Sequence, residues 1–279
     1  MPIDTPQTVK NARPFLKWAG GKSRLLKQYS ALFPGRDQIR RYYEPFLGSA
    51  AVFFHLQPKD ALLADVNENL VEIYRVVQNN VEDLVDLLGR YINDEDEFYR
   101  VRSQRPAELS SVERAARLIY LNKTCYNGLY RENKRGEFNV PFGRYKNPAI
   151  CDPMRLRIAS SALQGVDLQV GDFDKIVAPA DSGDFVYFDP PYAPLSTTSN
   201  FTSYNRHGFD EDDQRRLSAA FDDLSSRGCL LMLSNSNARL VHELYGGKKY
   251  RLIEIKARRS INSKANGRGP VTELLILNY

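Results

Sequence analysis

The sequence is poor in the residues that build disulfides, metal sites and membrane spans. Among its 279 residues there are only three cysteines and three histidines, and the cysteines form no C-x-x-C pair. A low and odd cysteine count argues against a disulfide scaffold, and the scattered histidines show no metal-ligand spacing. No apolar run approaches the ~20 residues of a membrane span, and no apolar signal region is present. We therefore expect a soluble, cytoplasmic protein that needs no metal and no membrane.

The composition is that of a folded, mildly basic protein. Hydrophobic residues make up 42% of the chain and charged residues 26%, which is enough for a sizeable core. Lysine and arginine outnumber aspartate and glutamate by 39 to 34. The basic residues include two stretches without any acid, residues 10–27 and 256–268. Such stretches favour a polyanionic partner such as nucleic acid.

Strand and helix patterns alternate along most of the chain. Strands are predicted at residues 41–44, 61–64, 166–170, 185–188, 229–233, 250–257 and 272–277. One helix is predicted at 22–33 and another begins at Ala50. Three more follow the N-caps Asn67, Asp152 and Asp210, and a last one ends at residue 244. This alternation predicts an open, largely parallel α/β sheet.

Residues 80–149 interrupt the alternation. A capping box formed by Ser110 and Glu113 opens a predicted helix over residues 112–124. An aromatic, basic, glycine-containing segment follows and is typical of a hairpin. We therefore predict a core of residues 1–79 and 150–279, with residues 80–149 inserted as a helical and hairpin subdomain.

The most informative motif is Asp189-Pro190-Pro191-Tyr192, directly after the apolar strand at 185–188. In open α/β sheets, ligands bind at the carboxyl ends of strands. Two prolines fix the backbone and remove two N–H donors, so that the local carbonyls are left as acceptors. A carboxylate, the Pro190 carbonyl and the Tyr192 ring can then hold a planar group that bears an amino function. The alternative is an ordinary strand-ending turn with a capping aspartate.

Two weaker motifs together indicate an adenosine-containing cofactor. The small-residue turn at 45–50, which includes Gly48, lets backbone amides approach a ligand closely. Asp65 ends the following strand, where α/β nucleotide binders place an acid on ribose hydroxyls. Taken singly, the first motif could be an ordinary α/β turn and the second a helix cap. Residues 15–22 contain the only tryptophan, Trp18, and by themselves are typical of an anchored N-terminal segment.

The order of these motifs resembles that of the DNA adenine-N6 methyltransferases of the Dam type (D12 class). The resemblance covers nearly the whole chain and rests on residues 15–22, 44–50, 64–67, 125–129, 136–143, 189–192 and 258–261. It implies a Rossmann-like sheet that binds S-adenosylmethionine and an enzyme that methylates the exocyclic amino nitrogen of adenine, usually in GATC. One departure is Ala50, where many relatives have a second glycine in the cofactor turn.

The resemblance also implies roles for individual residues. Catalysis is expected from Asp189 and Pro190, which would hold the amino group, and from Tyr192, which would stack on a flipped-out adenine. Cofactor contacts are expected from Trp18, Lys22, Gly48, Asp65, Phe173 and Asp189. DNA contacts are expected from Lys17, Tyr126, Asn127, Leu129, Arg131, Pro141 and Arg144, with hairpin packing as the alternative for Tyr126. The basic run adds Arg258 and Arg259 as phosphate contacts, with a solvated surface loop as the alternative.

These features predict a site-specific DNA adenine-N6 methyltransferase that acts on double-stranded DNA as a monomer. Repair marking, restriction protection and phage self-defence all stay open as its biological role. One alternative is a catalytically silent DNA-binding regulator with the same fold. Others are methyltransferases acting on RNA adenines or on cytosine amino groups. An aspartate at the head of the Asp189–Tyr192 motif argues against the latter two. The presence of Trp18, Lys22 and Asp65 together with Asp189 argues against a silent regulator.

Overall fold

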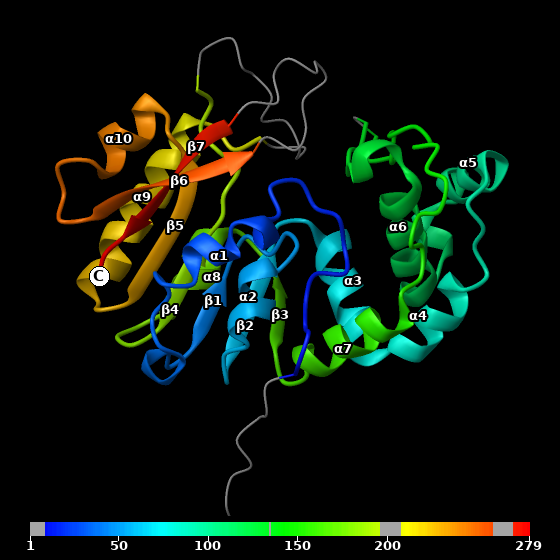
Figure 1. Cartoon of the computed structure of the whole chain (residues 1–279), viewed down its shortest axis with the longest axis horizontal. Helices are drawn as coiled ribbons and strands as arrows, with labels where there is room; N and C mark the ends of the chain where they lie inside the picture. Colours follow the sequence, from blue (N-terminus) through cyan, green and yellow to red (C-terminus); the bar gives the residue numbers. More distant parts are fainter. Residues whose placement is uncertain (1–8, 134, 196–207, 259–269) are drawn as a thin grey trace, which may run out of the picture. The chain divides into compact units, whose positions relative to one another are not determined.

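A computed structural model describes residues 9–133, 135–195, 208–258 and 270–279. It contains a seven-stranded sheet in the order β3-β2-β1-β4-β5-β7-β6 (Figure 1). The pairs β2–β3, β1–β4 and β4–β5 are parallel, whereas β7 runs antiparallel to β5 and β6. The predicted largely parallel α/β sheet is thereby confirmed. The strands are β1 (Tyr42–Glu44), β2 (Ala61–Asp65), β3 (Asp167–Val170), β4 (Phe185–Phe188), β5 (Leu230–Ser236), β6 (Arg251–Arg258) and β7 (Pro270–Leu277).

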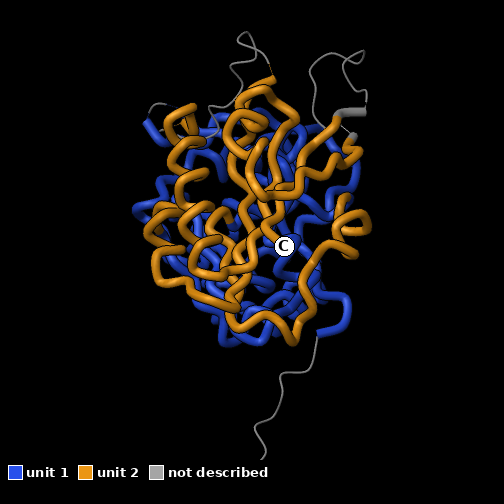
Figure 2. Tube along the Cα trace, turned by 90° about the vertical axis from the view of Figure 1, so that its left-hand side faces the viewer, with its two compact units in different colours: residues 1–24, 47–170 blue, residues 25–46, 171–279 orange. Residues whose placement is uncertain are grey.

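The chain divides into two compact units, which Figure 2 colours separately. Unit 1 comprises residues 1–24 and 47–170, and unit 2 comprises residues 25–46 and 171–279. This division into compact units is not a division into a core and an insertion. The limits of the predicted insertion, residues 80–149, therefore stay a prediction.

Unit 1 is mainly helical, and local side-chain caps begin its helices where the sequence predicts them. Asn67 Oδ1 accepts the Leu70 N–H at 3.2 Å, and the Ser110–Glu113 capping box is present. Asp152 Oδ1 caps the helix that begins at Pro153. The helices are η1 (Lys22–Arg24), α2 (Ala51–Leu56), α3 (Glu68–Asn79), α4 (Val81–Leu88), α5 (Glu95–Ser103), η3 (Pro106–Glu108), α6 (Ser111–Thr124), η4 (Tyr126–Gly128) and α7 (Pro153–Leu163).

The segment after α6 packs on its own small core within unit 1. Phe98 and Val101 of α5 and Tyr120 of α6 are buried together with Phe138 and Val140. The backbone of this segment is joined only by isolated antiparallel bridges, Cys125 to Phe142 and Glu132 to Phe138, among the residues that are described. The predicted hairpin is therefore an irregular one, which side-chain packing holds in place.

Unit 2 combines the strands β1, β4, β5, β7 and β6 with helices that pack through aromatic rings. The four residues of β4 are all buried, and Phe188 lies 6.3 Å from Phe221 between ring centroids. Asp210 forms the predicted cap of α9, as a capping box with Asp213. The helices are α1 (Leu26–Tyr29), η2 (Arg36–Gln38), α8 (Phe173–Val177), α9 (Glu211–Ser226) and α10 (Arg239–Tyr245).

The largest differences in extent between predicted and observed elements concern one helix and one strand. The helix expected over residues 22–33 is reduced to η1 and α1. The Ser30 N–H still donates to the Leu26 carbonyl, but the Leu32 N–H bonds Tyr29, only three residues back, and Pro34 disfavours a helical Phe33. In contrast, β5 continues past the predicted end at residue 233 to Ser236. Its last residues are polar but buried, which a pattern based on apolar periodicity does not register.

No helix of the described residues is long and apolar enough to cross a membrane. The described part of the chain also brings together no group of three or more histidine, cysteine, aspartate or glutamate side chains that could hold a metal ion.

Candidate functional site

The predicted catalytic aspartate lies at the carboxyl end of β4 in unit 2. Asp189 is half-buried, and its Oδ1 accepts a hydrogen bond from Ser234 Oγ of β5 at 2.7 Å. Ser234 Oγ also lies 3.2 Å from the Tyr187 hydroxyl. Burial and the charge of Asp189 raise the pKa of Tyr187 well above its ordinary value, so the phenol stays neutral. A strand neighbour thus fixes the orientation of the carboxylate.

The residues on both sides of the motif tyrosine are held by a buried relay of amides. Gln214 Nε2 of α9 donates to the Pro191 carbonyl at 2.9 Å, and Asn235 Nδ2 donates to Gln214 Oε1 at 3.0 Å. Asn235 Oδ1 accepts the Ala193 N–H at 3.0 Å, while Ser236 Oγ donates to the Ala193 carbonyl. Because Asn235 is 0% exposed, water does not compete for these bonds. We call this chain of contacts the amide relay.

Tyr192 is anchored by its hydroxyl as well as by its backbone neighbours. The hydroxyl donates to Glu273 Oε2 of β7 at 2.7 Å, and the residue as a whole is half-buried. Burial, followed by the negative charge of Asp189, raises the pKa of Tyr192 well above its ordinary value. The phenol therefore stays protonated and remains a donor at neutral pH.

Phe173, a predicted cofactor contact, is buried at the start of α8. Its ring stacks on Phe46 at 5.5 Å and lies 6.0 Å from Phe209. The Arg216 guanidinium lies 5.0 Å from the same ring and is held by Asp174 at 2.7 Å. The Phe173 ring is thus nearly covered, and the half-buried rings of Phe46 and Phe209 carry the accessible aromatic surface beside it.

In unit 1, Asp65 and Gly48 of the predicted cofactor turn are brought together. Asp65 Oδ1 accepts the Asn67 N–H at 2.9 Å, and its Oδ2 lies 3.4 Å from the Gly48 nitrogen. Burial raises the pKa of Asp65 from 3.8 to about 6, although these N–H groups lower it. Beside the carboxylate, Val66 is 54% exposed, and Val170 of β3 pairs with Asp65 and is also exposed. No motif in the sequence indicated this apolar surface.

The cofactor turn is tight and uses left-handed backbone at two positions. Gly48 has φ +46° and Ala50 has φ +51°. Left-handed backbone is unfavourable for residues with a Cβ, so glycine is the natural residue at position 48. Ala50 adopts the conformation that a second glycine would favour, and the turn therefore keeps its shape despite the alanine.

The N-terminal motif lies against this turn. A Cβ on Gly21 would lie 3.2 Å from Ser49 Oγ and 3.2 Å from the Trp18 carbonyl oxygen, so only glycine fits there easily. Lys22 is 4% exposed, and its Nζ donates to the Gly20 carbonyl at 2.6 Å. The Trp18 ring stacks on Tyr130 at 5.3 Å. The motif therefore connects the cofactor turn to the segment predicted to recognise DNA.

Lys17 is fixed where the predicted recognition segment begins. Its N–H donates to Asn122 Oδ1 at 3.0 Å, and Asn122 Nδ2 donates back to the Lys17 carbonyl at 2.6 Å. The Lys17 ammonium lies 4.5 Å above the ring of Tyr145. A Cβ on Gly128 would come within 2.6 Å of Lys17 Cδ, so this glycine is required for the close approach.

The aromatic and amide side chains of the recognition segment are accessible. Tyr126 is 53% exposed, and Asn127 is exposed with a left-handed φ of +57°. Leu129 is half-buried, and Pro141 is exposed and bonds the Tyr126 N–H through its carbonyl at 2.9 Å. These residues form one local surface in unit 1.

The predicted DNA-binding arginines lie in different surroundings. Arg131 is exposed, with its Nε donating to Asn139 Oδ1 at 2.7 Å. Arg144 is exposed and lies 3.9 Å from Glu95. Arg258 is the last residue of β6, and Arg259 lies outside the described residues.

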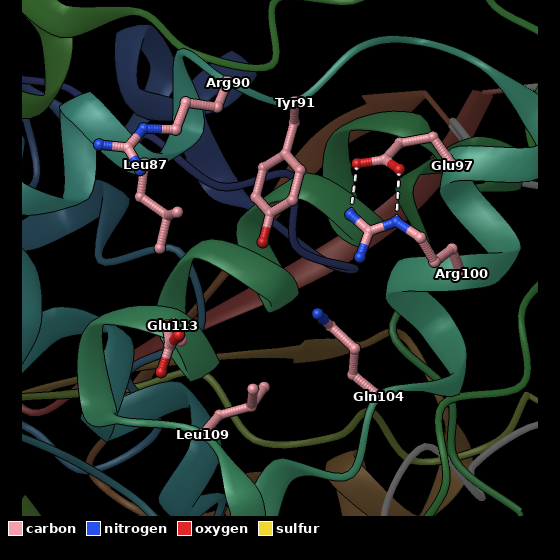
Figure 3. A pocket seen from close by; sticks show the side chains of 8 residues that line it. All are labelled: Leu87, Arg90, Tyr91, Glu97, Arg100, Gln104, Leu109 and Glu113. Carbon is pink, nitrogen blue, oxygen red and sulfur yellow. Dashed lines mark hydrogen bonds and ion pairs between the residues drawn. The ribbon is translucent and has the colours of Figure 1, made fainter.

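A cavity of about 240 Å³ lies elsewhere in unit 1, between α4, α5 and the start of α6 (Figure 3). Tyr91, Gln104 and the ion pair of Glu97 with Arg100 line it, and the ion-pair distance is 2.7 Å. None of the predicted site residues lines this cavity.

Several residues that support the motif loop were not predicted from the sequence. Ser234, Asn235 and Ser236 follow an apolar run and have the pattern of a loop, although they extend β5. Glu273 is the one charged residue in the otherwise largely apolar β7, and such an isolated charge was the available signal.

Comparisons with known proteins agree with the resemblance noted in the sequence. The family model described as D12 class N6 adenine-specific DNA methyltransferase matches residues 18–261. Type II methyltransferases of Lactococcus lactis subsp. cremoris and Methanocaldococcus jannaschii are each 43% identical to the chain over 96% of its length, and over 96% and 99% of their own. A DNA adenine methylase of Escherichia coli K12 is 36% identical over 96% of both chains.

Proposed function

The chain belongs to the D12 class of N6 adenine-specific DNA methyltransferases, and we propose that it acts as a monomer on double-stranded DNA, methylating a flipped-out adenine in GATC. Its seven-stranded, mostly parallel sheet agrees with the Rossmann-like methyltransferase fold. The DNA adenine methylases at 36% and 37% identity support the choice of adenine in DNA. GATC is the site that the resemblance implies.

The anchored loop of unit 2 is the observation that carries the proposal. Adenine's amino nitrogen is a poor nucleophile, because its lone pair is delocalised into the ring. The Asp189 carboxylate and the Pro190 carbonyl accept its two hydrogens, which favours a tetrahedral nitrogen with its lone pair directed outward. The new N–C bond would form as the S–C bond of the methyl donor breaks, with its electron pair left on a neutral sulfur. These oxygens stabilise the positive charge on the nitrogen until one of its protons leaves to water. Ser234 and the amide relay hold these acceptors in place before the adenine arrives. Less conformational entropy is therefore lost when the transition state forms.

Bound S-adenosylmethionine supplies a methyl group on a positively charged sulfur, and the residues of unit 1 fit such a ligand. We propose that Asp65 accepts the two ribose hydroxyls, since its carboxylate ends β2 beside the exposed Val66. Gly48 provides close backbone approach, and Lys22 and Trp18 complete the contacts from unit 1. In unit 2, Phe173 and Asp189 are the proposed contacts, with Phe46 and Phe209 presenting the accessible rings.

For DNA recognition we propose that the exposed Tyr126 and Asn127, with Leu129, occupy the space that the flipped base leaves in the stack. Arg131 reads guanine through the O6 and N7 acceptors of that base. Asn139 fixes the guanidinium through Nε and Nη2, and among the described residues no bond to Nη1 is present. The remaining contacts follow the resemblance: Lys17 at an outer base, Pro141 on a thymine methyl, and Arg144, Arg258 and Arg259 on phosphates.

Single-turnover methyl transfer tests the catalytic assignment. Replacement of Asp189 by alanine should leave the fold intact and slow transfer to a GATC duplex by at least ~10²-fold, because a main acceptor for the reacting nitrogen is lost. Asp212→Ala, an exposed aspartate in the first turn of α9, is the matched control and should keep the wild-type rate.

Substrate controls use the same assay. A matched RNA duplex, a duplex substituted at each position of GATC and a duplex premethylated at N6 should all be poor acceptors. A near-normal rate for folded Asp189→Ala would contradict the catalytic role. Equal methylation of duplexes that lack GATC would contradict the proposed sequence preference, while leaving adenine methylation intact.

A further inference from the structure

Glu273 lies on β7, far in the sequence from the motif loop that its side chain contacts. In the strand register it faces Ser236 of β5 on one side and Ile255 of β6 on the other. The next residues, from Leu274 to Leu277, are buried and apolar. A half-buried carboxylate at such a position loses much of its hydration, so it needs a strong hydrogen-bond donor. The Tyr192 hydroxyl is such a donor, at 2.7 Å.

The hydroxyl of Tyr29 supports this arrangement. It is buried in α1, and its pKa is raised by burial and then by the negative charges of Asp189 and Glu273. Both carboxylates therefore act on one hydroxyl within unit 2. Glu273 thus lies in the surroundings of the proposed reacting centre.

The hydrogen bond to Glu273 fixes the part of Tyr192 that the backbone contacts leave free. The amide relay holds the Pro191 carbonyl and the Ala193 nitrogen, which sets the backbone on both sides of the tyrosine. The side chain keeps rotation about its two torsions. An anchor at the far end of the ring removes that freedom and sets the plane of the ring.

We propose that Glu273 is a positioning residue for methyl transfer: it accepts the Tyr192 hydrogen and holds the ring in the plane in which it stacks on the target adenine. This inference rests on the proposed role of Tyr192. It predicts that a base in the target position is held less firmly when either end of the bond is removed, while binding of cofactor and duplex is retained.

Single-turnover rates of Glu273 and Tyr192 variants test the positioning role. Glu273→Ala and Tyr192→Phe should each slow transfer on the order of 10- to 100-fold, with binding of S-adenosylmethionine and of duplex nearly unchanged. Glu273→Gln should recover most of the rate, because an amide oxygen still accepts the hydrogen bond. The double variant should be no slower than the slower single variant, since both changes remove one interaction. Glu254→Ala, an exposed carboxylate on β6, is the matched control.

A second measurement reports ring position without turnover. A duplex with 2-aminopurine in place of the target adenine fluoresces when the base leaves the stack, and a ring stacked on that base quenches it. The bound duplex should be brighter with Glu273→Ala and Tyr192→Phe than with the wild type, and Glu273→Gln should be close to the wild type.

The outcomes separate this inference from the proposed function. If Tyr192→Ala slows methyl transfer but Glu273→Ala keeps the wild-type rate and fluorescence, the positioning role of Glu273 alone is overturned. A wild-type rate for Tyr192→Ala would overturn the role of the tyrosine itself. If Glu273→Ala does not fold, Tyr192→Phe is the deciding variant, because it removes the same hydrogen bond and leaves β7 unchanged. A wild-type rate and wild-type fluorescence for Tyr192→Phe would then overturn the inference.

Discussion

Replacement of Asn235 by alanine removes three hydrogen bonds at the centre of the amide relay. The lost partners are the N–H groups of Ala193 and Ser236 and the side-chain oxygen of Gln214, all in buried contacts. Each buried group left without a partner destabilises the fold by about 1–3 kcal/mol. With three such groups, Asn235→Ala should therefore lower the free energy of unfolding by about 3–9 kcal/mol. This is a large fraction of the ~5–15 kcal/mol that folded proteins possess.

Urea unfolding with linear extrapolation measures the change, and an unchanged m-value would show that the comparison is sound. Asn278→Ala is the matched control. Asn278 makes a similar set of bonds, to the Leu231 N–H, the Cys229 carbonyl and Ser225 Oγ, but at the opposite end of β5 and in a half-buried position. Its loss should lower the free energy of unfolding by about 1–3 kcal/mol, because water replaces some of the bonds.

Activity distinguishes the two variants more sharply than stability. Per folded molecule, Asn235→Ala should slow single-turnover transfer on the order of 10²-fold, because the residues beside Tyr192 lose their anchor. Asn278→Ala should keep the wild-type rate. Equal rates in the two variants, or a change below ~1 kcal/mol for Asn235→Ala, would refute the reasoning that the relay both stabilises and orders the loop.

Two further predictions concern the cofactor and the recognition sequence. Because burial raises the pKa of Asp65 to about 6, the affinity for S-adenosylmethionine should weaken as pH falls through 6, whereas the free energy of unfolding should rise as pH falls from 6 toward 4. Asp65→Asn should flatten both pH profiles. A wild-type affinity that does not change with pH in titration calorimetry would contradict the ribose contact. Arg131→Ala should reduce discrimination at one guanine by about 1–3 kcal/mol in kcat/KM on singly substituted duplexes. A uniform loss on every sequence, as for a phosphate contact, would contradict base reading by Arg131. Relaxation at one guanine in Arg135→Ala instead would assign the contact to the neighbouring exposed Arg135.

The positions of helices and strands follow mainly from local information. The caps at Asn67, Ser110, Asp152 and Asp210 were predictable because each bonds a backbone N–H only three residues away. The ends of β2 and β4 were predictable because an apolar run stops there at an aspartate. Since ligands bind at such strand ends in α/β sheets, the sequence alone identifies Asp65 and Asp189 as candidate site residues.

The short N-terminal helix shows where a local pattern is insufficient. The apolar spacing over residues 22–33 fits a helix, yet only η1 and α1 form. Helices this short gain most of their stability from tertiary packing, so periodicity alone does not set their limits.

The sequence by itself determined the order of strands and helices, the class of fold and the motif residues Asp189, Pro190 and Tyr192. Only the tertiary structure decided what holds that motif: Ser234 and Asn235, which extend β5, and Glu273, which bonds a tyrosine 81 residues away in the chain. The physical reason is that a polar side chain is stable in the interior only when other elements supply its hydrogen-bond partners. Periodicity describes neighbours along the chain, whereas those partners come from strands and helices that meet only after folding.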